Sequence, residues 1–212
     1  MGPIAGQSGW ITSGTSAAIQ SAVVQSGSQA LRADGHLGAQ DGLFGISLNA
    51  NQVVTFEVDF LHTGAPVQAG LGVYGNDADN DTFPDFIGQI VKSHTSGVYI
   101  IGNTNSGSTL GGFPDGTWHH LVLSLNVPAL TMTGSVDAQT IGTIPINNAI
   151  VPTSLTYVVL YSFGNGAGNT AANDSYFDNL RVSVVPEPTS LTLIGLAAIG
   201  PITRRRRAES RA

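Results

Sequence analysis

The densest group of side chains able to bind an ion lies in one short acidic segment, residues 76–85. Its four carboxylates are Asp77, Asp79, Asp81 and Asp85. Carboxylates at every second position of a turn can converge on one hard cation, and calcium takes six to eight oxygen ligands. Thr82 stands where a calcium loop carries the glycine of its sharp turn, and Gly88 stands where such a loop ends in a glutamate. Two interpretations follow, a calcium site or a solvated loop rich in Asp and Asn.

A second candidate for chemistry is the segment Glu57–His62. Retaining glycoside hydrolysis needs two carboxylates about 5–5.5 Å apart. Glu57 and Asp59 alternate and therefore share one face of a strand. However, His62 occupies the position at which Glu-x-Asp-x-x-Glu glucanase strands carry the second glutamate, and residues 1–185 contain no glutamate besides Glu57. A glycosidase would have to use an aspartate as its acid, so we expect the exposed polar face of a strand.

Other catalytic patterns are missing from the sequence. His119 and His120 are adjacent, so in a strand they point to opposite faces and cannot chelate one ion. No Gly-x-Ser-x-Gly elbow marks a nucleophile, and the glycines of segment 107–112 lack the following lysine of a phosphate loop. We therefore predict that the protein is not an enzyme.

Exposed aromatic side chains are the usual stacking platforms for sugars, and only 7% of the residues are aromatic. Most of them, including Trp10 and Trp118, are expected in the core or in strands. Tyr74, Phe83 and Tyr99 lie beside the acidic segment and are the better candidates for sugar binding; Phe86, Phe113 and Tyr161 are further candidates.

The charge is divided unevenly along the 212 residues. Residues 1–185 contain twelve acids and three basic residues, a net charge of −9, whereas residues 186–212 carry +3. An acidic body does not attract nucleic acid, so nucleic-acid binding is excluded as a first hypothesis. The absence of cysteine excludes disulfides, thiol catalysis and Cys-ligated zinc.

The body is predicted to be all-β, because apolar and polar residues alternate and Gly, Asn, Asp and Pro separate the alternating segments. Turns are expected at 75–77, 114–116 and 164–166. About ten strands at this spacing indicate an antiparallel two-sheet sandwich. We expect them at Ser28–Ala33, Val54–Phe60, Gln68–Tyr74, Phe86–Val91, Gly97–Ile101, Thr117–Leu125, Leu130–Val136, Ile141–Ile146, Thr156–Phe163 and Ser175–Val184.

Several stretches of the body resemble the concanavalin A-like, laminin G-like jelly roll of exported bacterial proteins. They are Gly6–Trp10, Gln25–Arg32, Asp115–Val122, Thr131–Val136 and Tyr176–Val182. The resemblance implies a jelly-roll domain over residues 1–185. It also implies that Asp178 on the closing strand joins a structural calcium with residues near the N-terminus; the alternative is an aspartate that caps the strand or stabilises a turn.

The C-terminus has three parts in order. Pro186, Glu187 and Pro188 halt the last strand. The apolar segment 191–202 follows, and then Arg204, Arg205, Arg206 and Arg207. Residues 189–203 would form a short hydrophobic helix of about 22 Å, less than a bilayer core of about 30 Å. The arginines would hold its end on the cytoplasmic side.

This arrangement closely resembles the PEP-CTERM sorting signal of Gram-negative environmental bacteria. The resemblance implies that residues 186–212 are a sorting signal, and that an exosortase in the inner membrane recognises it, cleaves near Pro-Glu-Pro and releases the body. Such a signal serves only an exported chain, and residues 1–6 have neither a basic nor an apolar leader. We therefore expect a signal peptide, and the first strand of the jelly roll, upstream of Met1.

Together these features predict an exported, exosortase-processed protein of the cell surface or extracellular matrix. It passes transiently through the inner membrane and is not catalytic. The expected ligand is a polysaccharide, with calcium as the supporting ion. The alternatives are a glycoside hydrolase or polysaccharide lyase of the same fold with an atypical site, and a purely structural surface protein.

Overall fold

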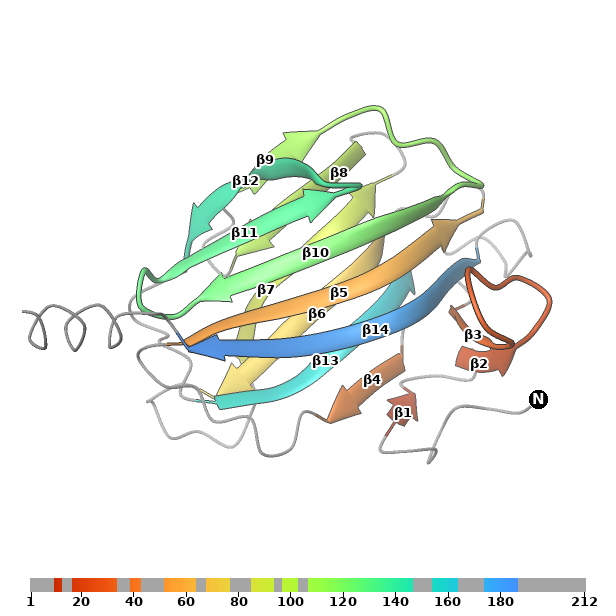
Figure 1. Ribbon diagram of the computed structural model, residues 1–212, viewed down its shortest axis with the longest axis horizontal. Coiled ribbons are helices and arrows are strands. Elements are labelled where there is room, and N and C mark those ends of the chain that lie inside the picture. The colour runs from red at the N-terminus through yellow and green to blue at the C-terminus, as the bar shows by residue number, and fades with distance from the viewer. Residues whose placement is uncertain are drawn as a thin grey trace, which may run out of the picture.

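The computed structural model describes ten stretches of the chain that together make a β-sandwich (Figure 1). The described residues are 10–12, 17–33, 39–42, 52–63, 68–76, 85–93, 97–102, 107–146, 154–163 and 174–186. They form fourteen strands in two seven-stranded sheets, and every pairing between neighbouring strands is antiparallel.

The sheet nearer the viewer in Figure 1 is called the front sheet, and the other the back sheet. The front sheet has the order β12 (Gln139–Pro145), β11 (Thr131–Val136), β10 (Trp118–Asn126), β5 (Gln52–His62), β14 (Ser175–Pro186), β3 (Ala30–Ala33), β2 (Ala17–Gln20). The back sheet has the order β1 (Trp10–Thr12), β4 (Ala39–Gly42), β13 (Ser154–Phe163), β6 (Gln68–Asn76), β7 (Asp85–Ser93), β8 (Gly97–Gly102), β9 (Gly107–Leu110).

One apolar core lies between the two sheets. In β5 the residues Val54, Phe56, Val58 and Phe60 alternate with polar ones, and all four are fully buried. Leucines 121, 123 and 125 of β10 follow the same rule. Because side chains of a strand alternate between its faces, one buried face leaves the other free for solvent or a ligand. The alternation predicted for these two strands is confirmed.

The sheets also approach closely where a glycine of one faces a large side chain of the other. Gly88 of β7 has no Cβ, and the space that a Cβ would need is filled by the Cε and Sδ atoms of Met132 in β11. Gly134 of β11 faces Ile100 of β8 in the same way. Since protein cores are close-packed, these two glycines set the distance between the sheets over β7, β8 and β11.

A two-residue hairpin joins β11 to β12. Asp137 and Ala138 form its turn with φ angles of 48° and 63°. Left-handed values at both central positions match the right-handed twist of the flanking strands. The Asp137 carboxylate also accepts a hydrogen bond from the His120 backbone N–H at 2.8 Å, which fixes the turn to β10.

The predicted all-β, antiparallel two-sheet architecture is confirmed, and all ten predicted strands are present with small shifts at their ends. The sequence did not reveal β1, β2, β4 and β9, which are three or four residues long. The turn predicted at 75–77 was wrong in its first two positions, because Gly75 and Asn76 continue β6.

The predicted C-terminal hydrophobic helix lies outside the described residues, as do the segment upstream of β1 and the turn at 164–166. Within the part of the chain that the structure describes, no helix has the length and apolar character needed to cross a membrane.

Candidate functional site

The outer face of the back sheet carries a glycine surrounded by uncharged ring and amide side chains. Leu71 and Val73 of β6 enter the core, so Gly72 and Tyr74 face outward. A Cβ added at Gly72 would lie 3.7 Å from Tyr74, 3.8 Å from Gln89 of β7 and 3.9 Å from Tyr161 of β13. Three neighbouring strands therefore bring these side chains together around Gly72.

Contacts between these side chains fix their positions. The Tyr161 hydroxyl donates a hydrogen bond of 2.8 Å to Oε1 of Gln89. Tyr74 packs edge-on against Phe86, with 5.5 Å between the ring centroids. Tyr161 is buried, whereas Tyr74 and Gln89 are partly exposed. We call Gly72, Tyr74, Gln89 and Tyr161 the tyrosine cluster.

The electrostatic character of the tyrosine cluster is neutral. Burial raises the pKa of the Tyr74 hydroxyl above its usual value of 10.0, so the hydroxyl remains protonated at neutral pH. A partly exposed ring offers an apolar surface with a polar edge, and the Gln89 amide offers a donor and an acceptor. This combination suits a ligand with both apolar faces and hydroxyl groups.

Of the aromatic residues named as candidates for sugar binding, Tyr74 and Tyr161 belong to this cluster, and Phe86 packs against Tyr74. Tyr99 lies in β8 opposite Val91, and Phe83 lies outside the described residues. The sequence analysis missed Gly72 and Gln89. The signal for Gly72 was present in the alternation of segment 68–74, which places Gly70, Gly72 and Tyr74 on one face.

The four aspartates of the acidic segment are only partly described. Asp85 begins β7 opposite Gly75, whereas Asp77, Asp79 and Asp81 lie outside the described residues. Among the described residues, no group of three or more His, Asp or Glu side chains is placed to hold a metal ion. The calcium site at 76–85 stays a prediction.

The outer face of the front sheet carries a different cluster, built from carboxylates and a histidine. His120 of β10 lies directly opposite Asp59 of β5, and their Nδ1 and Oδ1 atoms are 2.8 Å apart. The Asn179 side chain donates to the other Asp59 oxygen at 2.7 Å, and Nε2 of His120 lies 3.8 Å from Glu57. We call Glu57, Asp59, His120 and Asn179 the acidic cluster.

This arrangement explains why Glu57 and Asp59 share a face without forming a pair of free carboxylates. Asp59 has one oxygen at the imidazole and the other at an amide, and its side chain is only 17% exposed. The position of Asn179 depends on a β-bulge between Asp178 and Arg181, where Asn179 adopts φ 55°. In the acidic cluster His120 and Asn179 thus engage both oxygens of Asp59, and Glu57 lies beside His120.

Asp178 anchors the segment that precedes β3. Its Oδ2 atom accepts hydrogen bonds of 3.0 Å from the backbone N–H groups of Gln25 and Ser26, and its Oδ1 atom accepts one of 2.8 Å from the Asn179 N–H. These contacts favour the turn-stabilising interpretation of Asp178. The structural calcium implied by the resemblance stays a prediction.

Two histidines are structural. His62 ends β5 inside the sandwich, stacked on Phe60, with Nδ1 3.1 Å from the Ser175 hydroxyl. Ser175 and His62 are 0% and 1% exposed, so a substrate has no access to this serine–histidine contact. His119 is buried as well, and its ring nitrogens contact Asp137 and the Pro114 carbonyl.

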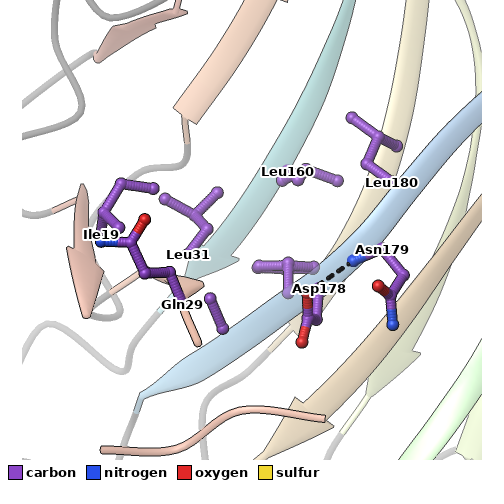
Figure 2. Close-up of a pocket in the computed structure, with 9 residues that line it drawn as sticks. Ile19, Gln29, Leu31, Leu160, Asp178, Asn179 and Leu180 are labelled. Atoms are coloured by element: carbon purple, nitrogen blue, oxygen red, sulfur yellow. Dashed lines mark hydrogen bonds between the residues drawn. The ribbon is translucent and has the colours of Figure 1, made fainter. Parts of the chain in front are cut away.

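A pocket of about 290 Å³ opens where β3 separates from β14 (Figure 2). Its walls are mostly apolar: Ile19, Leu31, Leu160 and Leu180. Gln29 and Asp178 add polar groups to the lining. The pocket lies where the pairing of β14 with β3 ends after Phe177, next to the bulge in β14.

The residues of the predicted sorting signal begin at the end of β14. Pro186 is the last residue of that strand and lies opposite Gln52 of β5. Glu187, Pro188 and Arg204–Arg207 lie outside the described residues.

Comparison with protein families identifies the C-terminal segment. The model of the PEP-CTERM protein-sorting motif matches residues 184–207. This match confirms the resemblance stated from the Pro-Glu-Pro, apolar and arginine segments. A comparison with curated proteins finds no match for the chain.

Solved structures with a similar fold include two lyases and a carbohydrate esterase. An endo-beta-1,4-glucuronan lyase from the fungus Trichoderma reesei is 12% identical with a TM-score of 0.55, over 79% of this chain and 86% of that one. A carbohydrate esterase from Shiga toxin-encoding bacteriophage phi24B is 16% identical with a TM-score of 0.55, over 84% and 91%. An alginate lyase from Pseudomonas aeruginosa is 15% identical with a TM-score of 0.54, over 75% and 76%.

At these identities the similarity establishes the fold. The body has the concanavalin A-like jelly-roll sandwich that the sequence resembled. The chain joins this sandwich to a C-terminal PEP-CTERM motif, which marks an exported protein that an exosortase processes.

Proposed function

We propose that this protein is a non-catalytic polysaccharide-binding protein of the cell surface or extracellular matrix. The sorting motif at 184–207 supports export, transient residence at the inner membrane and processing by an exosortase. The structural neighbours are named for glucuronan, alginate and carbohydrate ester substrates, which supports a polysaccharide as the ligand class.

The tyrosine cluster is the proposed binding surface, and the partly exposed Tyr74 beside Gly72 is the observation that carries this assignment. A sugar ring has C–H groups that pack on an aromatic face, and its hydroxyls need hydrogen-bond partners. Gly72 places no side chain between Tyr74 and Gln89, so a ring stacked on the exposed part of Tyr74 can reach Gln89, which Tyr161 holds in place and which can serve the hydroxyls.

The absence of cleavage is proposed from the chemistry of the two clusters. The side chains around Gly72 are tyrosines and an amide, without the paired carboxylates that glycoside hydrolysis uses. The carboxylates of the acidic cluster lie on the opposite sheet, and Asp59 is engaged by His120 and Asn179. The rival function is that of a glycoside hydrolase or lyase with an atypical site.

The net charge of the body decides which polysaccharides are expected to bind in the absence of calcium. Twelve acids against three basic residues repel polyuronates at long range, so neutral polysaccharides are favoured. Calcium bound by Asp77, Asp79, Asp81 and Asp85 would reduce this repulsion beside Tyr74, and would extend binding to acidic chains.

A glycan array probed with the full chain, with calcium and with EDTA, tests these statements together. We expect retention of neutral polysaccharides in both conditions and of polyuronates only with calcium. No retention of any glycan would contradict the binding function and favour a purely structural protein. Release of reducing sugar, or of unsaturated product, would favour the enzyme.

The calcium site has its own test. Calcium should raise the melting temperature of the protein, and the substitutions Asp79→Ala and Asp81→Ala should remove that rise, because ligand binding to the folded state stabilises it. An equal response of wild type and both variants would exclude the site at 76–85.

A further inference from the structure

The two edges of β14 differ along its length. On one side β5 pairs with β14 from Ser175 to Pro186, interrupted only by the bulge. On the other side β3 pairs with Ser175–Phe177 alone. Figure 1 shows β3 and β2 beside the beginning of β14, while the rest of the strand runs on at the border of the front sheet. Among the described residues, no strand pairs with this edge from Leu180 onward.

The unpaired part of β14 is exposed and apolar toward its end. Val184 is 40% exposed and Val185 is 55% exposed, and these are the exposed large hydrophobic residues of the described chain. Natural proteins protect a free edge with lysine, proline, a bulge or a covering loop, because unpaired N–H and C=O groups attract another strand. Here the bulge comes before the free edge, and within the edge the protecting residues are Arg181, its single charged residue, and the final Pro186.

The sorting motif begins inside this strand. The matched segment starts at residue 184 and β14 ends at Pro186, so three residues belong to both the fold and the motif. Since β5 occupies one edge, an enzyme that recognises the start of the motif on the folded domain can reach its backbone only from the free edge.

We propose that the free edge of β14, Arg181–Pro186, is a docking surface for the processing enzyme. This inference rests on the sorting part of the proposed function. The enzyme adds an extended segment beside β14, and main-chain hydrogen bonds align that segment with the approach to Pro-Glu-Pro. The pocket of Figure 2 lies at the upstream end of the same edge and receives an apolar side chain of the docked segment, between Leu31 and Leu180.

The decisive experiment moves the motif away from the first half of the edge, Arg181–Ser183, while the motif keeps its own sequence. Six Gly and Ser residues are inserted between Ser183 and Val184 of the full chain, which keeps residues 184–207 intact. The chain is produced in a host that carries the processing enzyme, and the rate of conversion to the processed form is followed by pulse-chase. We expect the rate to fall at least tenfold. The matched control carries the same insertion between Asp137 and Ala138, in the exposed β11–β12 turn, and is expected to be processed like wild type.

Processing of the Ser183 insertion variant at the wild-type rate or faster would overturn the proposal, because the motif alone would then suffice. A second variant of unchanged length, Ser183→Glu, places a carboxylate on the edge outside the matched segment. It should also slow processing, and a wild-type rate with an unchanged melting temperature would likewise contradict docking at this edge. If wild type itself is not processed, the sorting function fails, which is a different result from either variant matching wild type.

Discussion

The outer faces of the two sheets are built from the same alternating strands but carry different chemistry. On the front sheet, Asp59 holds His120 and Asn179 in a network of charged and polar groups. On the back sheet, Tyr74, Gln89 and Tyr161 surround a glycine with uncharged groups. On the front face both oxygens of Asp59 are engaged by its neighbours, whereas on the back face the ring of Tyr74 stays partly exposed beside Gly72. We therefore expect the charged side chains of the front face to stabilise the fold and the uncharged side chains of the back face to bind a ligand.

The largest expected effect concerns the front sheet. Asp178→Ala removes the acceptor of three backbone N–H groups. We expect a loss of about 2 kcal/mol in the free energy of unfolding, because hydrogen bonds to charged groups contribute about 1.5–3 kcal/mol each and these are partly exposed. Thermal unfolding should show a melting temperature lower by about 4–8 °C. An equal loss in calcium and in EDTA fits the turn-stabilising role; a loss seen only with calcium would instead identify a calcium ligand.

Glycan binding distinguishes the two faces directly. Tyr74→Ala should weaken binding of a retained polysaccharide about tenfold, equivalent to about 1.4 kcal/mol, because the stacking surface is removed. The matched control is Trp118→Ala, a ring on the outer face of the front sheet, which should bind like wild type. Affinity electrophoresis measures both. Loss of binding in the Trp118 variant alone would move the site to the front sheet.

The acidic cluster should matter for stability and not for binding. Asp59→Ala leaves the Asn179 amide and the His120 ring without their acceptor. We expect it to lower the free energy of unfolding by about 1 kcal/mol. In a double-mutant cycle with Asn179→Ala, measured by chemical denaturation, the double variant should lose less free energy of unfolding than the sum of the two single losses. Reduced glycan binding by either single variant would contradict the division between the faces.

The smallest effect is expected from alkaline titration of the back sheet. Burial raises the pKa of Tyr74 in the folded protein above 10.0, so its contribution to stability is present below pH 10 and is lost as the pH rises through the folded value. Tyr74→Phe should therefore lose less stability than wild type between pH 9 and pH 12. The front-sheet Tyr176 has its pKa raised by burial and then by the Asp174 charge, so Tyr176→Phe is a comparison variant in the same measurement. Identical curves for wild type and Tyr74→Phe would show that the Tyr74 hydroxyl is not buried in solution.

Much of the fold could be predicted from the sequence because alternation is a local property. The alternation within Val54–Phe60 and within His119–Leu125 shows which face of each strand is buried, and no other strand is needed to see it. The short strands escaped prediction because three or four residues are too few to show a period. β4 has only the residues Ala39–Gly42, and it is a strand because β13 and β1 pair with it.

The candidate sites could be predicted less completely. Tyr74 was chosen for its place beside the acidic segment, and it is Gly72, Gln89 and Tyr161 that make its surroundings a site. These residues come from three strands whose order in the sheet is not written in any one segment. Asp59 was recognised as a partner of Glu57 on one face, but its contacts with His120 and Asn179 span 61 and 120 positions of sequence.

The sequence by itself determined which residues face the core, that the body is all-β, and that the chain ends in a sorting motif, because each depends on residues near one another in the chain. Tertiary structure decided which strands are neighbours, and with that the partners of the charged groups. It brought Arg32 to Asp174, with 2.8 Å between Nε and Oδ2, and Lys92 to Asp115, with 2.6 Å between Nζ and Oδ1. Among the residues that the structure describes, it also left one edge of β14 without a pairing strand where the motif begins. Strand pairing depends on which of several compatible apolar faces pack together, and that choice is made only when the whole sandwich closes.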